Sequence, residues 1–349
     1  MKKVFIMAYL RKNLGDDLFV KMLLEKYQDF DFYIKYDKHE YLDVLNKYDN
    51  LHLLYGKDTD EELYNSDVNE YDAYVYIGGS IFMEGGSSYN LSEKFYDFVK
   101  RCKENNKPFC YISCNYGPYQ TQEYFDLSRK NFNECTDICF RDLYSYNLFS
   151  DIDSVRYAPD FAFSYKAPEV QKIKNSVGIS VIDLGIRNDL KDKSDTYLNF
   201  LCNNISNYIN SGNEVYLFSF CEYEGDEVTI EKITNRFPNE PKVHAVKYSG
   251  DVDEFLKIYN QMEYMICARF HAMILSSTAK QKVHVMSYSK KIDRVIEDLD
   301  LNFPILHFNE LTENYKLPLD GFASVEDGKI DQISKKAEKQ DEAIRKYIV

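Results

Sequence analysis

The chain has 349 residues, and its 57 aspartate and glutamate residues outnumber 43 lysine and arginine residues, giving a formal net charge of −14. This acidic balance argues against nucleic-acid binding as the main activity, although local cations in a cleft can still bind a small anion. No run of about 18 apolar residues occurs, which excludes a membrane-spanning helix and leads us to expect a cytoplasmic protein with reduced cysteines. The length favours two domains.

Short apolar runs alternate with helical patterns along the chain, and this alternation predicts an α/β fold with parallel sheets. In the first half we expect strands at Val4–Tyr9, Phe32–Tyr36, Tyr74–Ile77, Phe109–Cys114 and Ile138–Phe140. The helices expected between them are Asp17–Tyr27, Leu91–Asn105 and Phe125–Asn133.

A second series of strands and helices follows a polar segment, 165–175, that contains a proline and is the expected linker. Its strands are predicted at Ser176–Val181, Val215–Phe220, Val243–Val246, Tyr264–Cys267 and Lys282–Met286. Its helices are predicted at Asp195–Asn210, Gly225–Arg236, Val252–Gln261, Ala272–Thr278 and Lys291–Asp298. We therefore expect one Rossmann-like domain over residues 1–165 and another over 176–331, facing each other across a cleft. A C-terminal helix over 332–349 is expected to return to the first domain.

The segment Tyr264–Ser276 is the most informative part of the second half, because a short apolar run delivers Arg269 and His271 just before a helical pattern. Cations at a strand-to-helix junction suit an anion, since the free N–H groups and dipole of the helix add to the attraction. Arginine offers a flat fork of donors for carboxylate or phosphate, and histidine can move a proton near neutral pH. Lys291 follows one helix and one strand later, a span compatible with a return to the same cleft, and its alternative is a surface position like that of Lys290. The alternative is that Arg269 and His271 only anchor a loop.

Polar loops also follow successive strands of the first half. They carry Asn13, Gly15, Asp16 and Asp17 after the first strand, and then Gly78, Gly79, Ser80, Glu84, Asn115, Tyr116 and Arg141. The first loop lacks the glycine spacing of a dinucleotide site, and helix capping alone would explain its two aspartates. Several such loops on one edge of one sheet nevertheless favour a binding site.

Taken together, these residues resemble the polysaccharide pyruvyl transferase family over nearly the whole chain. The resemblance rests on Asn13-x-Gly15-Asp16, Gly78-Gly79-Ser80 with Glu84, Tyr116-Gly117-Pro118, Arg141-Asp142-x-x-Ser145, Pro159-Asp160, Arg269-x-His271 and Tyr288-x-x-Lys291. Two positions depart from the family pattern: Ser80 replaces a glycine, and Glu84 replaces the usual aspartate. These departures alter the acceptor side more than the donor side.

The resemblance implies two Rossmann-like domains arranged as in GT-B glycosyltransferases. It also implies transfer of a pyruvyl group from phosphoenolpyruvate to two hydroxyls of a sugar in a surface polysaccharide or its precursor, giving a cyclic ketal and phosphate. Arg269, Lys291 and Arg141 would then bind the donor, and His271 would be the general acid. Glu84 is the first candidate for the acceptor-side base, and Asp16 or Asp17 the second.

The remaining expectations concern the acceptor side and the partners. Acceptor or loop roles fall to Asn13, Gly15, Asp17, Gly78, Gly79, Ser80, Asn115 and Tyr116. No metal or other cofactor is expected, and the partners are phosphoenolpyruvate and a sugar acceptor, which a lipid can carry at the inner membrane face.

Two other readings compete with pyruvyl transfer. One is a GT-B glycosyltransferase that uses a nucleotide sugar, with Glu222, Glu224 or Asp226 as the carboxylate near the ribose. The other is a non-catalytic family member that serves as a scaffold in polysaccharide assembly. The group of Arg269, His271 and Lys291 argues against a scaffold, which has no need of clustered cations beside a titrating side chain.

Overall fold

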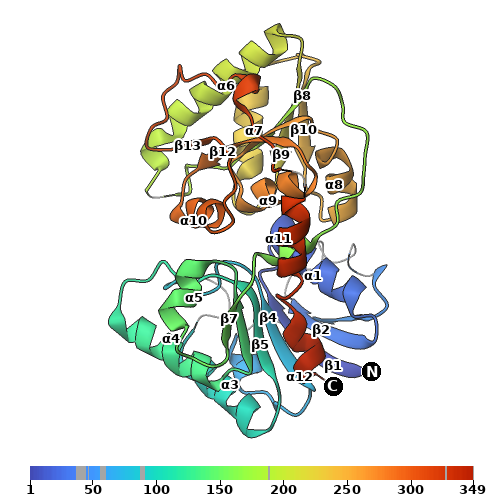
Figure 1. Cartoon of the computed structure of the whole chain (residues 1–349), viewed down its shortest axis with the longest axis vertical. Coiled ribbons are helices and arrows are strands. Elements are labelled where there is room, and N and C mark those ends of the chain that lie inside the picture. Colours follow the sequence, from blue (N-terminus) through green and yellow to red (C-terminus); the bar gives the residue numbers. More distant parts are fainter. Residues whose placement is uncertain are drawn as a thin grey trace. The chain divides into compact units, whose positions relative to one another are not determined.

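The computed structural model describes residues 1–36, 45, 47–55, 60–86, 91–187, 189–326 and 328–348. The chain divides into two compact units (Figure 1). Unit 1 comprises Met1–Leu10, Asp16–Ser164 and Gln332–Val349, and unit 2 comprises Arg11–Gly15 and Tyr165–Asp331. Within the described ranges, no helix is both long enough and apolar enough to cross a bilayer.

Unit 1 contains a seven-stranded parallel sheet with the order β3-β2-β1-β4-β5-β6-β7. Its strands are β1 (Lys2–Ala8), β2 (Phe30–Tyr36), β3 (Leu51–Tyr55), β4 (Ala73–Ile77), β5 (Phe109–Cys114), β6 (Asp137–Phe140) and β7 (Val155–Tyr157). Its helical segments are α1 (Leu14–Lys26), α2 (Asp60–Tyr64), α3 (Glu93–Glu104), α4 (Gln122–Glu134), α5 (Leu143–Phe149) and η2 (Phe161–Ser164), although the first two residues of α1 group with unit 2.

Unit 2 contains a six-stranded parallel sheet with the order β10-β9-β8-β11-β12-β13, which is the Rossmann order counted from β8. Its strands are β8 (Ser176–Ser180), β9 (Glu214–Ser219), β10 (Val243–Lys247), β11 (Tyr264–Cys267), β12 (Lys282–Ser287) and β13 (Ile305–His307). Its helical segments are η3 (Lys191–Lys193), α6 (Ser194–Asn210), α7 (Asp226–Thr234), α8 (Val252–Tyr259), α9 (Phe270–Thr278), α10 (Lys290–Asp298) and η4 (Leu319–Gly321).

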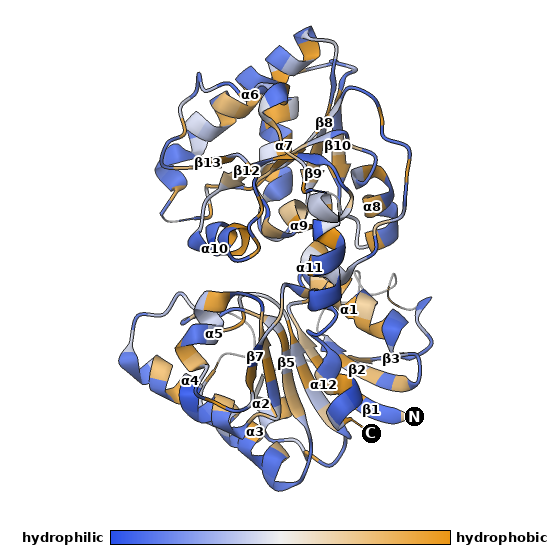
Figure 2. Ribbon diagram, in the orientation of Figure 1, coloured by the Kyte–Doolittle hydropathy of each residue, from blue (hydrophilic) through white to orange (hydrophobic). Residues whose placement is uncertain are grey.

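Each sheet is the centre of its own hydrophobic core. Hydrophobic residues concentrate along the strands, while the helices mix hydrophobic and hydrophilic positions (Figure 2). Helix α3 shows the local reason: Phe95, Phe98, Val99 and Cys102 recur at helical spacing and are buried. The side chain of Ser92 accepts a hydrogen bond from the Phe95 N–H and caps this helix. All eight cysteines are buried and free.

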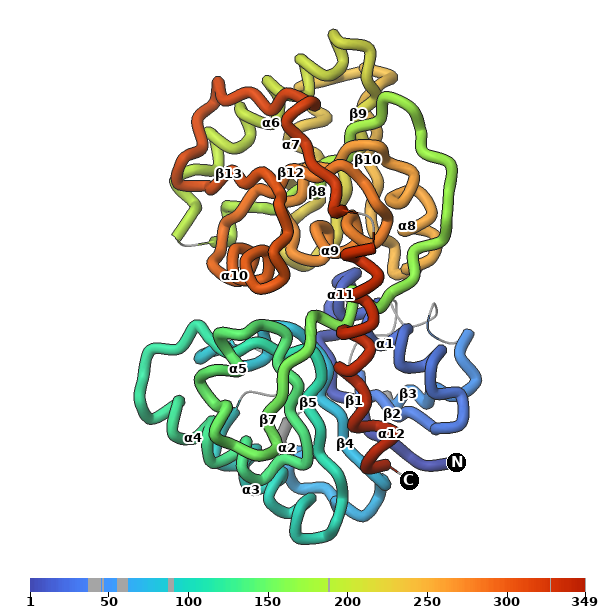
Figure 3. The backbone as a smooth tube through the Cα atoms, viewed as in Figure 1, coloured from blue at the N-terminus to red at the C-terminus, as the bar shows by residue number. Residues whose placement is uncertain are grey.

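The C-terminal segment forms two helices, α11 (Lys329–Ala337) and α12 (Glu342–Tyr347), where the sequence predicted one helix. The break between them holds Gln340, whose side-chain oxygen accepts the Ser113 N–H at 2.8 Å and whose amide donates to the Ala158 carbonyl at 2.6 Å. Arg345 of α12 forms an ion pair with Asp29. Within unit 1 the C-terminal segment therefore lies beside strands from the N-terminal part of the chain (Figure 3).

Candidate functional site

The junction of β11 and α9 is built by backbone hydrogen bonds to a neighbouring strand. The N–H groups of Ala268 and Arg269 both donate to the Ser180 hydroxyl at the end of β8, at 3.0 and 3.2 Å. Arg269 is the N-cap residue of α9, and His271 lies in its first turn. Since β8 and β11 are adjacent strands on either side of the point where the strand order reverses, this junction lies where Rossmann-like sheets bind ligands.

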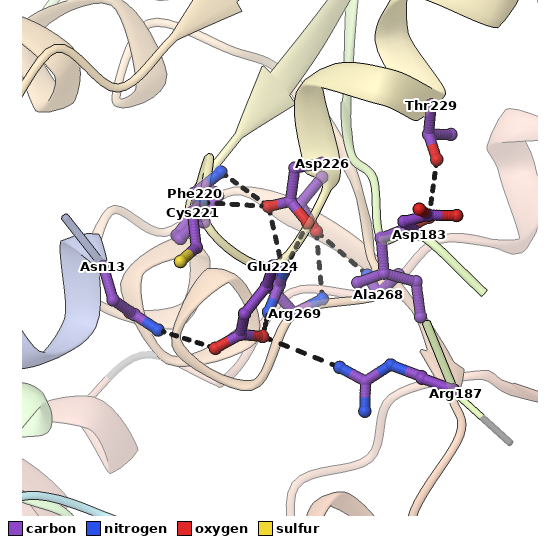
Figure 4. Close-up of polar contacts among 12 residues, drawn as sticks. Asn13, Asp183, Arg187, Phe220, Cys221, Glu224, Asp226, Thr229, Ala268 and Arg269 are labelled. Atoms are coloured by element: carbon purple, nitrogen blue, oxygen red, sulfur yellow. Dashed lines mark hydrogen bonds and ion pairs between the residues drawn. The ribbon is translucent and has the colours of Figure 1, made fainter. Parts of the chain in front are cut away.

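Two carboxylates hold the Arg269 guanidinium (Figure 4). Its Nε donates to Asp226 Oδ2 at 3.1 Å, its Nη2 donates to Asp226 Oδ1, and its Nη1 donates to Glu224 Oε2. Asp226 Oδ2 also accepts the backbone N–H groups of Phe220 and Cys221, at 2.9 and 3.0 Å. Burial raises the pKa of Asp226 to about 6, because it outweighs the opposing effect of Arg269. Arg269 is thus part of an ion triad with buried Asp226 and partly exposed Glu224.

Three cations converge around the Tyr288 ring. The Arg187 guanidinium lies 4.3 Å from the ring centroid and Lys291 Nζ lies 5.8 Å from it. Burial alone would raise the pKa of Tyr288, but Lys291, Arg187 and Arg269 outweigh it and lower the pKa. Burial also opposes ionisation of Glu224, and Arg269, Arg187 and Lys291 again prevail and lower its pKa. Both shifts report a positive local potential, which suits an anionic ligand.

The segment Arg11–Gly15 groups with unit 2, although the sequence prediction assigned it to a domain spanning residues 1–165. The Leu14 N–H donates to the Phe220 carbonyl at 3.0 Å, and Asn13 forms an antiparallel bridge with Cys221. These backbone contacts join residues about 200 positions apart, so their sequence neighbours gave no sign of them. Asn13 and Gly15 are therefore placed with Arg269 and His271.

Gly15 provides the surface on which the His271 ring lies. The Asn13 side chain accepts the Gly15 N–H at 3.0 Å and shapes the turn. A Cβ atom at Gly15 would lie only 1.8 Å from His271 Nδ1, far inside any contact distance. The Asn13-x-Gly15 pattern thus has a physical reason: the turn must leave room for the imidazole.

Unit 1 holds a separate buried polar network. Arg141 Nη1 donates to Asp160 Oδ2 at 2.8 Å, and its Nη2 donates to Asn115 Oδ1 at 2.6 Å. The Ser80 hydroxyl donates to the same Asn115 oxygen at 3.3 Å. A Cβ at Gly79 would lie 2.5 Å from the Arg141 guanidinium, so glycine is required beside this cation. The network brings the Gly78-Gly79-Ser80 loop together with the loops that follow β5 and β6.

Arg141, predicted as a donor-binding residue, lies in unit 1, whereas Arg269 and Lys291 lie in unit 2. It is 3% exposed, and the carboxylate of Asp160 already offsets its charge. These contacts give Arg141 a structural role in the loops of unit 1, and donor binding by this residue stays a prediction.

The Glu84 carboxylate binds the two residues that precede α4, Gln120 and the N-cap residue Thr121. It accepts the Thr121 hydroxyl at 2.6 Å, the Thr121 N–H at 3.0 Å and the Gln120 N–H. The Thr121 hydroxyl, followed by these N–H groups, lowers the pKa of Glu84. A lowered pKa makes a carboxylate a weaker base at neutral pH. These contacts favour the second candidate for the acceptor-side base.

The other predicted residues of unit 1 divide into core and loop positions. Asp16 and Asp17 are buried at the start of α1, and a Cβ at Gly78 would lie 3.5 Å from Asp16 Oδ1. Tyr116 is a core residue, because its ring is buried and its hydroxyl shares a hydrogen bond with Ser128 at 3.0 Å. Asp16 is therefore beside the glycine motif.

Three residues of the Arg269 cluster differ from the sequence prediction. Arg187 follows β8, as the predicted site residues follow other strands, but the segment before it is largely apolar and gave no signal of a site. Glu224 and Asp226 were predicted only as candidates for a ribose carboxylate, and in the structure both bind Arg269. Among the described residues, no group of three or more His, Cys, Asp or Glu side chains is arranged to hold a metal ion.

Solved structures with the same architecture define the fold class. A proposed UDP-N-acetylglucosamine 2-epimerase from Listeria monocytogenes is 10% identical, with a TM-score of 0.60 and coverage of 98% of this chain and 93% of that chain. The UDP-GlcNAc 2-epimerase from Neisseria meningitidis, bound to UDP-GlcNAc, is also 10% identical, with a TM-score of 0.59 and coverage of 99% and 100%. These likenesses confirm the expected α/β fold of two Rossmann-like domains of the GT-B class.

The family follows from the sequence itself. The family model described as polysaccharide pyruvyl transferase matches residues 13–290, from the Asn13 turn to just beyond Tyr288. The chain belongs to the polysaccharide pyruvyl transferase family.

Proposed function

We propose that this protein transfers a pyruvyl group from phosphoenolpyruvate to two hydroxyls of a sugar in a surface polysaccharide or its precursor, forming a cyclic ketal and releasing phosphate. One observation carries the proposal: His271 lies in the first turn of α9, two residues after Arg269, and the side chains of Lys291 and Arg187 both lie near the Tyr288 ring in the same unit. Phosphoenolpyruvate carries a carboxylate and a phosphate, so its site needs several fixed cations beside one group that can move a proton.

The chemistry assigns His271 the role of general acid. Protonation of the methylene carbon of phosphoenolpyruvate makes the neighbouring carbon electrophilic, and one sugar hydroxyl adds to it. The second hydroxyl then displaces phosphate, so two C–O bonds form while the bond to the phosphate oxygen breaks. The acceptor-side base takes the hydroxyl protons as the C–O bonds form; one of these protons returns to His271 and the other leaves with the phosphate. Positioned proton transfer of this kind contributes roughly 10²–10⁴-fold to the rate.

Two carboxylates of unit 1 are candidates for the acceptor-side base. Glu84 is held by the start of α4, and hydrogen bonding lowers its pKa. Asp16 lies beside Gly78 at the start of α1. We therefore place Asp16 ahead of Glu84 as the base.

The test is binding and turnover with His271→Gln and Lys291→Gln, with Lys290→Gln as the matched control because Lys290 is the exposed neighbour of Lys291. Calorimetry with phosphoenolpyruvate should show saturable binding that Lys291→Gln weakens and Lys290→Gln leaves unchanged. His271→Gln should retain binding and lose phosphate release when sugar acceptors are present.

Arg269→Ala is a poor test, because it leaves the buried Asp226 carboxylate without its guanidinium and costs about 3–5 kcal/mol of stability. UDP serves as the competing ligand. Binding of UDP without binding of phosphoenolpyruvate, alone or with acceptors present, would replace pyruvyl transfer by nucleotide-sugar chemistry. Unchanged phosphate release by His271→Gln would remove the histidine from the mechanism.

A further inference from the structure

The Glu224 carboxylate lies at the centre of the cation cluster of unit 2 (Figure 4). Its Oε2 atom accepts from Arg269 Nη1 and lies 3.7 Å from Arg187 Nη2, and its Oε1 atom accepts from Asn13 Nδ2 at 3.3 Å. Lys291 adds its charge, since it helps to lower the pKa of Glu224. Two guanidinium groups and an amide around one carboxylate form a donor set suited to a carboxylate ligand.

The two carboxylates that bind Arg269 differ in how firmly they are held. Asp226 is fully buried, and the backbone N–H groups of Phe220 and Cys221 bind it in addition to Arg269. Glu224 is held by side chains, and its own side chain is 26% exposed. Asp226 is therefore the permanent partner of Arg269, while Glu224 is the partner that a ligand can replace.

The loop that carries Glu224 is exposed at the residues before Glu224 and has a fixed backbone conformation at Gly225. Its neighbour Tyr223 is 64% exposed, and Glu222 forms an exposed ion pair with Lys12. The loop ends at Gly225, whose φ of +79° and proximity to Asp183 both require glycine. Replacement of Glu224 by a ligand would thus move only the exposed tip of this loop, and the start of α7 would stay in place.

We infer that Glu224 is an internal competitor that occupies the position of the donor's carboxylate, and that Arg187 and Asn13 join Arg269 in binding that carboxylate when Glu224 withdraws. The inference rests on the proposed function for the identity of the donor. It adds two binding residues that lie on different loops from Arg269, one after β8 and one in the Asn13 turn.

The exchange conserves charge at a buried site. With Glu224 in place, two carboxylates offset the Arg269 and Arg187 guanidinium groups, and the incoming carboxylate restores the same balance. The buried Arg269 keeps its full set of acceptors in both states, which avoids the large cost of an uncompensated buried charge. The consequence is weaker donor binding, because the ligand must displace an internal anion.

The experiment measures donor affinity by calorimetry in matched pairs of variants. Glu224→Gln keeps the shape of the side chain and removes its charge, so it should bind phosphoenolpyruvate about tenfold more tightly than the wild type. Its control is Glu222→Gln, two residues away on the same loop. Arg187→Gln should bind about tenfold more weakly, and its control is Arg236→Gln, which changes an exposed arginine of the same unit. Circular dichroism melts establish that each variant is folded.

Two further probes identify the group that Glu224 mimics. Pyruvate has the carboxylate and lacks the phosphate, and inorganic phosphate has the reverse. Glu224→Gln should therefore improve pyruvate binding more than phosphate binding. A greater gain for phosphate would overturn the assignment of the donor's carboxylate to this position.

The outcomes separate this inference from the proposed function. If the wild type binds phosphoenolpyruvate and Glu224→Gln binds it no more tightly, the internal competitor is wrong and pyruvyl transfer stands. If Glu224→Gln gains affinity for UDP and none for phosphoenolpyruvate, a ligand can replace Glu224, but phosphoenolpyruvate is not the donor. Absence of binding by every variant to all four probes rejects both.

Discussion

Replacement of Gly15 by alanine tests whether the Asn13 turn exists to position His271. Gly15 lies in the first turn of α1 and has an ordinary backbone conformation, so alanine needs no strained φ angle there. In an exposed helix, glycine to alanine usually stabilises a protein by up to about 1 kcal/mol. Any loss of stability or activity therefore reports the clash with the imidazole.

The size of the effect follows from the contact distances. The new Cβ would lie 1.8 Å from His271 Nδ1, and an ordinary contact begins at 3.4 Å, so the ring must withdraw by roughly 1.6 Å. His271 is half-buried, and the stability cost should be the roughly 1–3 kcal/mol typical of overpacking. A proton donor displaced by more than about 1 Å should lose on the order of 100-fold in turnover.

The assay compares phosphate release, phosphoenolpyruvate affinity and urea unfolding for Gly15→Ala and a control, Gly321→Ala. The nearest atom to a Cβ at Gly321 lies 4.0 Å away, so the control adds the same methyl group without a clash. We expect turnover to fall far more than donor affinity in Gly15→Ala, and neither to change in the control. Turnover within about threefold of the wild type would refute the argument that Gly15 positions His271 as the proposed general acid.

Three further predictions concern stability. Gly79→Ala should destabilise unit 1 by about 2–3 kcal/mol in urea unfolding, because the new methyl meets the immobile Arg141 guanidinium at 2.5 Å; a neutral effect would contradict this packing. Gln340→Leu should lower the free energy of unfolding by about 2–4 kcal/mol in the same measurement, because the buried Ser113 N–H and the Ala158 carbonyl both lose their hydrogen-bond partner. A change below about 1 kcal/mol would show that other groups replace the amide. Burial lowers the pKa of His284 from 6.5 to about 4, so the unfolded chain binds the proton more tightly than the folded chain does. The free energy of unfolding should therefore fall by about 3 kcal/mol as the pH drops from 6.5 to 4. In His284→Leu this part of the pH dependence should disappear, and an unchanged pH profile would show that His284 is not its source.

Two central strands show what a local sequence pattern can predict. The predicted strands Phe109–Cys114 and Tyr264–Cys267 have the observed bounds, because buried parallel strands read as continuous apolar runs. The sequence did not predict the edge strands β3, β7 and β13. Strands β7 and β13 have three residues each, which is too short for any periodicity to develop. The C-terminal segment has a helical composition throughout, and only the contacts of Gln340 explain why it forms two helices.

The sequence by itself determined the fold class and the family motifs, among them Arg269-x-His271, because these depend on periodicity and on residues that are close in the chain. Only the tertiary structure placed the Asn13 turn with unit 2 and made Glu224 the partner of Arg269. The reason is distance along the chain: Asn13 and Glu224 are 211 residues apart, and the antiparallel bridge between Asn13 and Cys221 brings them together. A local sequence pattern shows which residues are charged, whereas contacts between distant segments determine which charged groups lie side by side.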